Sequence, residues 1–143
     1  MKAFITIGLL AVFLAGCAHF ELQAMSRADG KVYQGTAEQT GRGHGTISLS
    51  IKDVMYNGTF ALTGSDMYTS FVNAYASNST GKSANAFGFE SGGGHNATFS
   101  AILSSASGDG LRCMFNGDGR LGTGGGICVD AQKNVYDLVY SMK

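Results

Sequence analysis

The cysteines have the most specific chemistry in this chain of 143 residues. Cys17 follows an uncharged apolar run over residues 3–14, whereas Cys113 and Cys128 lie near the C-terminus and 15 positions apart. A thiol can be alkylated, oxidised to a disulfide or used as a metal ligand, depending on its surroundings. The single cysteine near the N-terminus and the distant pair therefore need separate explanations.

Residues 1–16 have the organisation of an export signal. Lys2 supplies a positive charge, and the apolar run that follows is shorter than the roughly 20 residues that a transmembrane helix requires. Ala15 and Gly16 are small residues placed directly before Cys17, as a signal peptidase requires of residues before its cut. We therefore expect residues 1–16 to be a signal peptide.

The stretch Leu14-Ala15-Gly16-Cys17 resembles the lipobox of bacterial lipoproteins. The resemblance implies that Cys17 begins the mature chain and carries a thioether-linked diacylglycerol, usually with a further N-acyl chain. Two or more acyl chains anchor a protein stably, whereas one binds reversibly. In this family an Asp after the cysteine favours the inner membrane, so Ala18 implies the outer membrane, facing the periplasm. The alternative is an ordinary secretory signal cleaved nearby, with Cys17 incidental.

Lipidation of Cys17 would leave Cys113 and Cys128 as an even pair in an oxidising compartment, where structural disulfides persist. Closing a loop of this size contributes about 3 kcal/mol in the chain-entropy model. Two free buried thiols or a metal pair are the alternatives, although a zinc site would need more ligands at close spacing. No metal or other cofactor is expected. The histidines all stand far from the pair in sequence: His19, His44 and His95.

The composition favours one small β domain without a nucleic-acid partner. The formal net charge is +0, so no basic surface for nucleic acid is implied. Charged residues make up only 14% of the chain, whereas there are 22 glycines and no proline. A chain of this length is sufficient for one domain. Its composition is typical of short strands joined by glycine-rich turns.

The apolar pattern predicts strands along most of the chain. Residues 46–51 are the clearest case, because isoleucine and leucine alternate there with hydroxyl residues. Gly58 interrupts the next alternating run and indicates a bulge or a close approach of two backbones. Eight to ten short strands at roughly ten-residue spacing predict an all-β fold, either a small antiparallel up-and-down barrel or a sandwich.

Three segments are expected. Residues 1–16 are the signal peptide, residues 17–30 form the lipidated N-terminus with a flexible tether, and residues 31–143 form the β domain. Part of the tether, over residues 22–27, could instead pack on the domain as a first strand. Residues 67–76 fit helical spacing but are rich in strand-forming side chains, so a strand is preferred.

The two domain cysteines present a conflict of register. The apolar residues two positions before and after Cys113 share its face, whereas Ile127 and Val129 alternate against Cys128. If both cysteines point inward, one apolar set must point outward, unless a glycine bulge resets the register.

The candidates for catalysis lie in loops. His44 and His95 both occur in glycine-rich stretches and could meet at one end of a barrel, with Asp66 or Asp109 completing a hydrolytic site. Exposed loop histidines without a catalytic role are the simpler interpretation. Asp137 lies within the last predicted strand and is expected to have a structural role.

The segment around Cys113, Cys128 and residues 136–138 resembles small uncharacterised proteobacterial lipoproteins, a resemblance that implies no known activity. The leading interpretation is a non-enzymatic envelope lipoprotein with a binding or structural role, such as inhibiting a cell-wall hydrolase or blocking a surface receptor. Its expected partners are the membrane, through Cys17, and another envelope protein. The first alternative is a periplasmic carrier of a small apolar ligand, and the second is a small hydrolase that uses the loop histidines.

Overall fold

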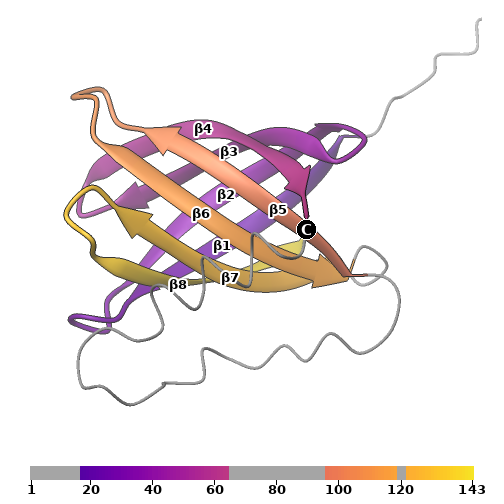
Figure 1. Cartoon of the computed structure of the whole chain (residues 1–143). Helices are drawn as coiled ribbons and strands as arrows, with labels where there is room; N and C mark the ends of the chain where they lie inside the picture. The colour runs from indigo at the N-terminus through magenta and orange to yellow at the C-terminus, as the bar shows by residue number, and fades with distance from the viewer. Residues whose placement is uncertain (1–16, 65–95, 119–121) are drawn as a thin grey trace, which may run out of the picture.

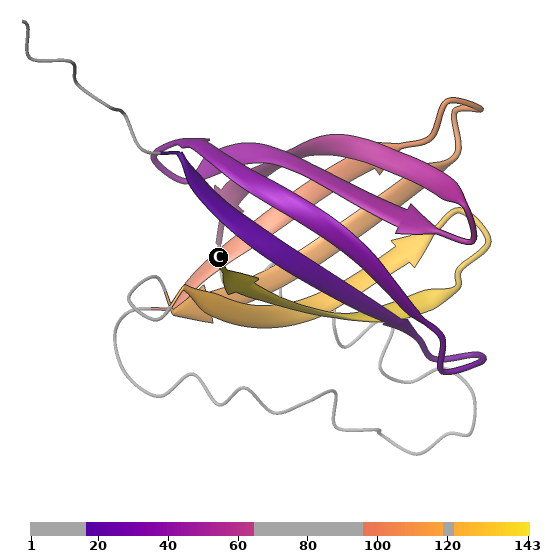
Figure 2. The same cartoon turned by 180° about the vertical axis from the view of Figure 1, so that it is seen from behind.

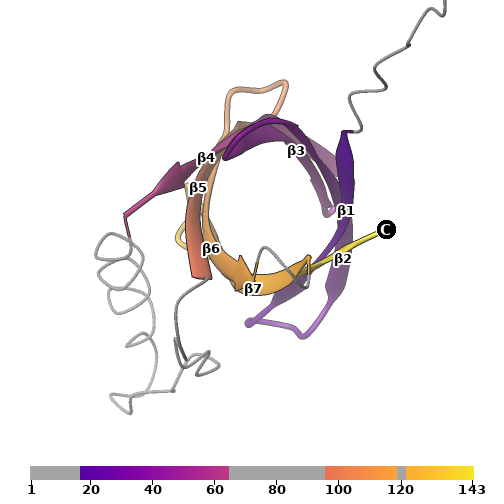
Figure 3. The same cartoon turned by 90° about the vertical axis from the view of Figure 1, so that its right-hand side faces the viewer.

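The computed structural model describes residues 17–64, 96–118 and 122–143, and this part of the chain forms a closed β-barrel (Figure 1). Each strand pairs antiparallel with the next, and the last strand pairs with the first. Figure 3 shows the wall as a continuous ring. The prediction of an all-β fold is therefore confirmed, and of its two alternatives the up-and-down barrel is the one observed. The strands are β1 (Ala18–Ser26), β2 (Val32–Gly41), β3 (His44–Ile51), β4 (Val54–Thr63), β5 (Asn96–Ser104), β6 (Gly110–Asp118), β7 (Thr123–Asp130) and β8 (Val135–Met142).

The barrel interior is filled by alternate residues of every strand. In β3 the inward residues Ile47, Leu49 and Ile51 are buried, and the hydroxyl residues between them face outward. This is the arrangement that the alternation of residues 46–51 predicts. Large side chains exposed by 1% or less include Leu22, Ile47, Leu49, Leu103, Leu111 and Leu138.

The first strand begins earlier than the sequence suggests. The chain from Ala18 to Ser26 is β1 and closes the barrel between β2 and β8, where a tether was expected over residues 18–30 (Figure 2). The strand alternative over residues 22–27 describes this segment better. Phe20, Leu22 and Ala24 share the inward face, whereas the apolar Met25 is exposed on the outward face and breaks the alternation of apolar with polar residues.

The register of β6 and β7 resolves the conflict around the cysteines. Cys113 lies directly opposite Cys128, both are 0% exposed, and they form the predicted disulfide. Ile127 and Val129 point outward, and no bulge interrupts the pairing of the two strands. Both outward residues are nevertheless buried, at 2% and 6% exposure. Exposure therefore does not follow the inward and outward alternation in this part of the wall.

Gly58 lies where two backbones approach closely. The pairing of β3 with β4 passes through Gly58 without a register shift, so the close approach, and not the bulge, is the correct alternative. A Cβ atom at Gly58 would collide with the backbone carbonyl of Ile102 on β5. Glycine is required there because a carbonyl group in a paired strand cannot move aside.

Replacing Gly58 by Ala should lower the free energy of unfolding by about 2 kcal/mol, because the methyl group forces β4 and β5 apart. Urea denaturation of the purified protein measures this change. Gly64→Ala is the matched control, since a Cβ atom there meets nothing within 4 Å. Equal stability of the two variants would contradict the close approach.

The signal peptide expected over residues 1–16 and the strand preferred over residues 67–76 lie outside the described residues. Among residues 17–64, 96–118 and 122–143, the structure has no helix with the length and apolar character needed to cross a membrane.

Candidate functional site

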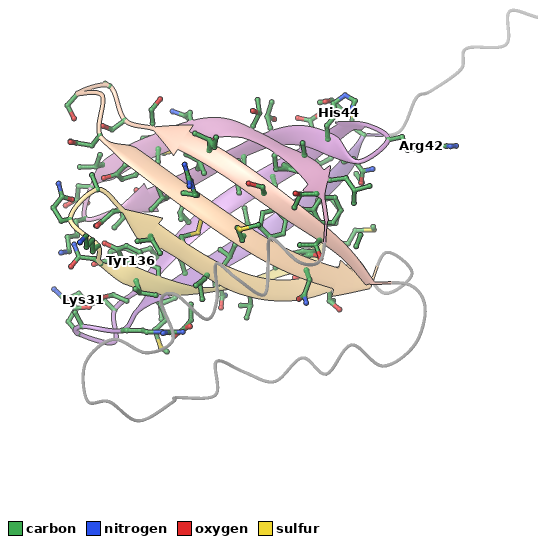
Figure 4. The ribbon with its side chains drawn as sticks, in the orientation of Figure 1. Lys31, Arg42, His44 and Tyr136 are labelled. Carbon is green, nitrogen blue, oxygen red and sulfur yellow. A yellow bond between two sulfur atoms is a disulfide. The ribbon has the colours of Figure 1, made fainter. Side chains whose placement is uncertain are left out.

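The two ends of the barrel differ, and Cys17 lies at one of them, directly before β1. We call this end the mouth; it contains the start of β1, the turn between β2 and β3, and the end of β8 (Figure 1). The opposite end, here called the far end, contains the turns that join β1 to β2 and β7 to β8. Arg42 and His44 lie at the mouth, whereas Lys31 and Tyr136 lie at the far end (Figure 4).

Cys17 is an exposed free thiol directly before β1. It lies beside Glu38 of β2, and a hydrogen bond with this carboxylate raises the pKa of the thiol, as do slight desolvation and the negative charge of Glu38. A raised pKa reduces the thiolate fraction at neutral pH and makes the thiol less reactive. Cys17 is thus accessible, but its surroundings are not those of a catalytic cysteine.

Aromatic rings gather inside the mouth. Phe99 stacks on Phe115 with ring centroids 5.5 Å apart, and Tyr140 meets Phe115 edge to face at 5.6 Å. Phe20 and Phe60 extend the cluster through further edge-to-face contacts at 5.8 Å, with Tyr140 and Phe99 respectively. Such pairs stabilise a site beyond the area they bury. The cluster makes the inner wall of the mouth apolar.

The same rings line a cavity of about 100 Å³. Its most polar wall group is Gln39, whose side-chain amide donates a hydrogen bond of 3.0 Å to the carbonyl of Gly41. Sites for drug-sized ligands usually measure about 300–1,000 Å³. The cavity has room for a small apolar group but not for a whole ligand of that size.

Glycines of β6 and β7 make room for Tyr140. Gly117 and Gly124 are paired across the two strands, and a Cβ atom on either would collide with the tyrosine hydroxyl. From the sequence, the glycine-rich residues 116–126 are expected to form a loop, but residues 116–118 belong to β6 and residues 123–126 to β7. The need for glycine at these two positions cannot be recognised from the stretch itself, because the tyrosine that occupies the space comes from β8.

At the far end, Asp130 organises the turn between β7 and β8. Its carboxylate accepts hydrogen bonds from the backbone amides of Gln132 and Asn134, at 3.0 and 2.8 Å, and from the hydroxyl of Tyr136 at 3.1 Å. Burial is the main cause that raises the pKa of Tyr136 above its ordinary value of 10.0, and the charge and hydrogen bond of Asp130 add to it. Tyr136 is therefore a protonated donor that supports the turn.

The hydroxyl of Tyr136 should make stability depend on pH in the alkaline range. Because its pKa is higher in the folded than in the unfolded state, its contribution is complete below pH 10 and is lost as the pH rises above 10. Tyr136→Phe should cost about 1–2 kcal/mol at pH 8, and its stability should fall less steeply above pH 10. Denaturant titrations at several pH values measure both. Parallel pH profiles for the two proteins would contradict this assignment.

An ion pair joins β8 to the chain just after β1. The guanidinium of Arg27 donates to both carboxylate oxygens of Asp137, with N–O distances of 2.7, 3.0 and 3.1 Å. Both side chains are partly exposed, so the pair contributes modestly to stability. Its position shows that Asp137 helps to hold the strands that close the barrel, which agrees with the structural role expected for it.

The residues proposed for catalysis do not form a described site. His44 is exposed at the mouth, whereas Asp109 lies in the turn between β5 and β6 at the far end, where it accepts a hydrogen bond from Ser107. His95 and Asp66 lie outside the described residues. In the described part of the chain, no three His, Cys, Asp or Glu side chains come together in a way that could hold a metal.

No protein-family model matches the chain, and no curated protein matches its sequence. Neither comparison therefore assigns a role to Cys17, to the aromatic mouth or to any other residue.

Proposed function

We propose that the protein is a non-enzymatic envelope lipoprotein, held at the outer membrane by acyl chains on Cys17, whose barrel binds another envelope component. The exposure of Cys17 directly before β1 is the observation that supports this most. A lipid attached there displaces no core side chain, because Cys17 is exposed and lies outside the core. The lipobox resemblance implies that the Cys17 thiol is lipidated, and its exposure leaves room for the attached acyl chains.

A binding or structural role suits the rest of the barrel. Apolar side chains fill the interior beyond the mouth, a disulfide joins β6 to β7, and the far-end turn is held by the hydrogen bonds of Asp130. Rigid surfaces lose little conformational freedom when they bind a partner. Inhibition of a cell-wall hydrolase and blockage of a surface receptor are specific forms of this role, and both rest on analogy of architecture.

Crosslinking in intact envelopes followed by capture of the protein tests the proposal. We expect one envelope protein to be enriched repeatedly over a capture with an unrelated lipoprotein. If the partner is a cell-wall hydrolase, the purified barrel should then inhibit it in a turbidity assay. Failure to crosslink any protein, in cells where the lipoprotein is abundant, would contradict the binding role.

A carrier of a small apolar ligand is the second candidate, because the aromatic cavity at the mouth is the observation that favours it. The cavity would hold one small apolar group, such as a ring or the end of a chain. Native mass spectrometry of protein purified without detergent tests this role. A bound mass that disappears in Ala37→Leu, which fills the cavity wall, would favour the carrier over the simple binder.

A further inference from the structure

We infer that the rim of the barrel mouth is a second, non-covalent membrane contact, which binds the headgroup layer of an anionic lipid bilayer. The rim consists of Arg42 and His44 in and after the turn between β2 and β3, Leu62 near the end of β4, and Met142 at the end of β8. The inference rests on the proposed lipidation of Cys17 for its geometry, and it adds a surface and a ligand class to that proposal.

The anchor leaves the barrel almost no freedom to move away from the membrane. Cys17 is followed at once by Ala18, which already pairs with Gln39 of β2. One extended residue spans at most about 3.6 Å. Phe20 is also paired with Met142 of β8, so β1 is held on both sides. Lipids on Cys17 would therefore bring the rim to within a few ångströms of the headgroups.

Two apolar side chains are held at the rim in exposed positions. Leu62 is 58% exposed and Met142 is 51% exposed. The backbone amide of Leu62 donates a 2.6 Å hydrogen bond to the carbonyl of Gly43, and that of Met142 donates a 2.7 Å bond to Gly122. These bonds fix both side chains at the end of the wall. Exposed apolar groups beside basic ones are typical of surfaces that lie in a membrane interface.

The charge at the rim favours an anionic surface on the side of Arg42. Figure 4 shows Arg42 pointing away from the barrel beyond the turn, and its neighbour Gly43 is bonded to Leu62. The negative charge of Glu21 is matched by Lys143, with 2.9 Å between nitrogen and oxygen. Glu38 beside Cys17 opposes an anionic surface, so we expect Arg42 and Leu62 to make the closest contact.

The first experiment places a polarity-sensitive fluorophore at each end of the wall. Ala61→Cys lies next to Leu62 near the mouth, and Ser104→Cys lies at the far end of β5; both positions are exposed. The lipidated proteins are labelled and reconstituted in vesicles of phosphatidylglycerol and phosphatidylethanolamine. We expect a blue-shifted emission at position 61 and none at position 104. The same emission at both positions would overturn the inference.

A mass spectrum of the labelled protein separates the two proposals. One label together with the mass of the acyl chains means that Cys17 is blocked, so the fluorescence then tests the orientation alone. Two labels without acyl mass mean that Cys17 carries no lipid. In that case the proposed function has failed, and the rim must be tested by a second experiment that does not need the anchor.

The second experiment measures the affinity of the rim without the lipid. The Cys17→Ser protein is sedimented with anionic vesicles of the same composition and with neutral phosphatidylcholine vesicles. We expect binding to the anionic vesicles only, weakened about tenfold by Arg42→Glu, because each basic residue near the surface contributes roughly fivefold or more. Lys31→Glu is the matched control at the far end and should bind as before. Equal effects of the two substitutions, or no binding to anionic vesicles, would overturn the inference.

Discussion

Replacing Cys17 by Ser should remove the protein from the membrane fraction of the cell almost completely. The hydroxyl of serine does not accept the diacylglycerol that we propose for Cys17, so the variant would have no acyl chains. Each buried methylene group contributes about 0.8 kcal/mol to membrane binding, and two chains together make attachment lasting. The non-covalent contact of the rim would be far weaker. Fractionation of envelopes and incorporation of labelled palmitate measure the outcome.

Ala18→Ser is the matched control for this experiment, because it leaves Cys17 in place and introduces the same hydroxyl one residue later. It should remain lipidated and in the membrane fraction. The barrel itself should be unaffected by Cys17→Ser, since the thiol is exposed and belongs to no described core contact. Unchanged palmitate labelling in Cys17→Ser would show that the lipoprotein proposal is wrong.

Removal of the disulfide should lower the free energy of unfolding by about 3 kcal/mol, the contribution expected for a loop of about 15 residues. Cys113→Ala combined with Cys128→Ala leaves no unpaired thiol in the core. In the chain-entropy model the loss arises mainly in the unfolded state, which gains freedom when the loop opens. The backbone hydrogen bonds between β6 and β7 should survive, so we expect the barrel to fold. Guanidinium denaturation followed by circular dichroism measures the change.

The native protein treated with a reducing agent is the second arm of this experiment. It should show a loss of similar size, because reduction opens the same loop and leaves both cysteine side chains in the core. Cys17→Ser serves as the control for loss of a cysteine as such, and its unfolding midpoint should equal that of the native protein. Identical midpoints for oxidised and reduced protein would mean that the bond contributes nothing to stability.

A strand can be predicted with its buried face where apolar and polar residues alternate without interruption. In β3, Ile47, Leu49 and Ile51 alternate with hydroxyl residues, and this local pattern is enough to identify both the strand and its buried face. In β1 the inward residues Phe20 and Leu22 alternate with polar residues in the same way, but the apolar Met25 is out of phase with them and exposed. The same stretch was therefore consistent with a tether until its pairing partners were known.

The candidate site was less predictable, because its parts come from different strands. The space for Tyr140 is made by Gly117 and Gly124, and neither glycine is adjacent to the tyrosine in sequence. The aromatic cavity likewise combines rings from β1, β4, β5, β6 and β8. Individual aromatic residues can be identified in a sequence, but their convergence depends on the pairing and tilt of the strands.

Three features can be recognised in the sequence alone: a cysteine in a stretch that resembles a lipobox, two further cysteines able to pair, and a series of alternating strands. These are properties of single residues or of short stretches. Three further features are visible only in the folded barrel: β1 pairs with β8, Cys113 faces Cys128 in the interior, and Cys17 lies at the mouth directly before β1. Barrel closure joins the first and last strands of the described chain, β1 and β8. Its register depends on every intervening strand pair, and no local pattern contains that information.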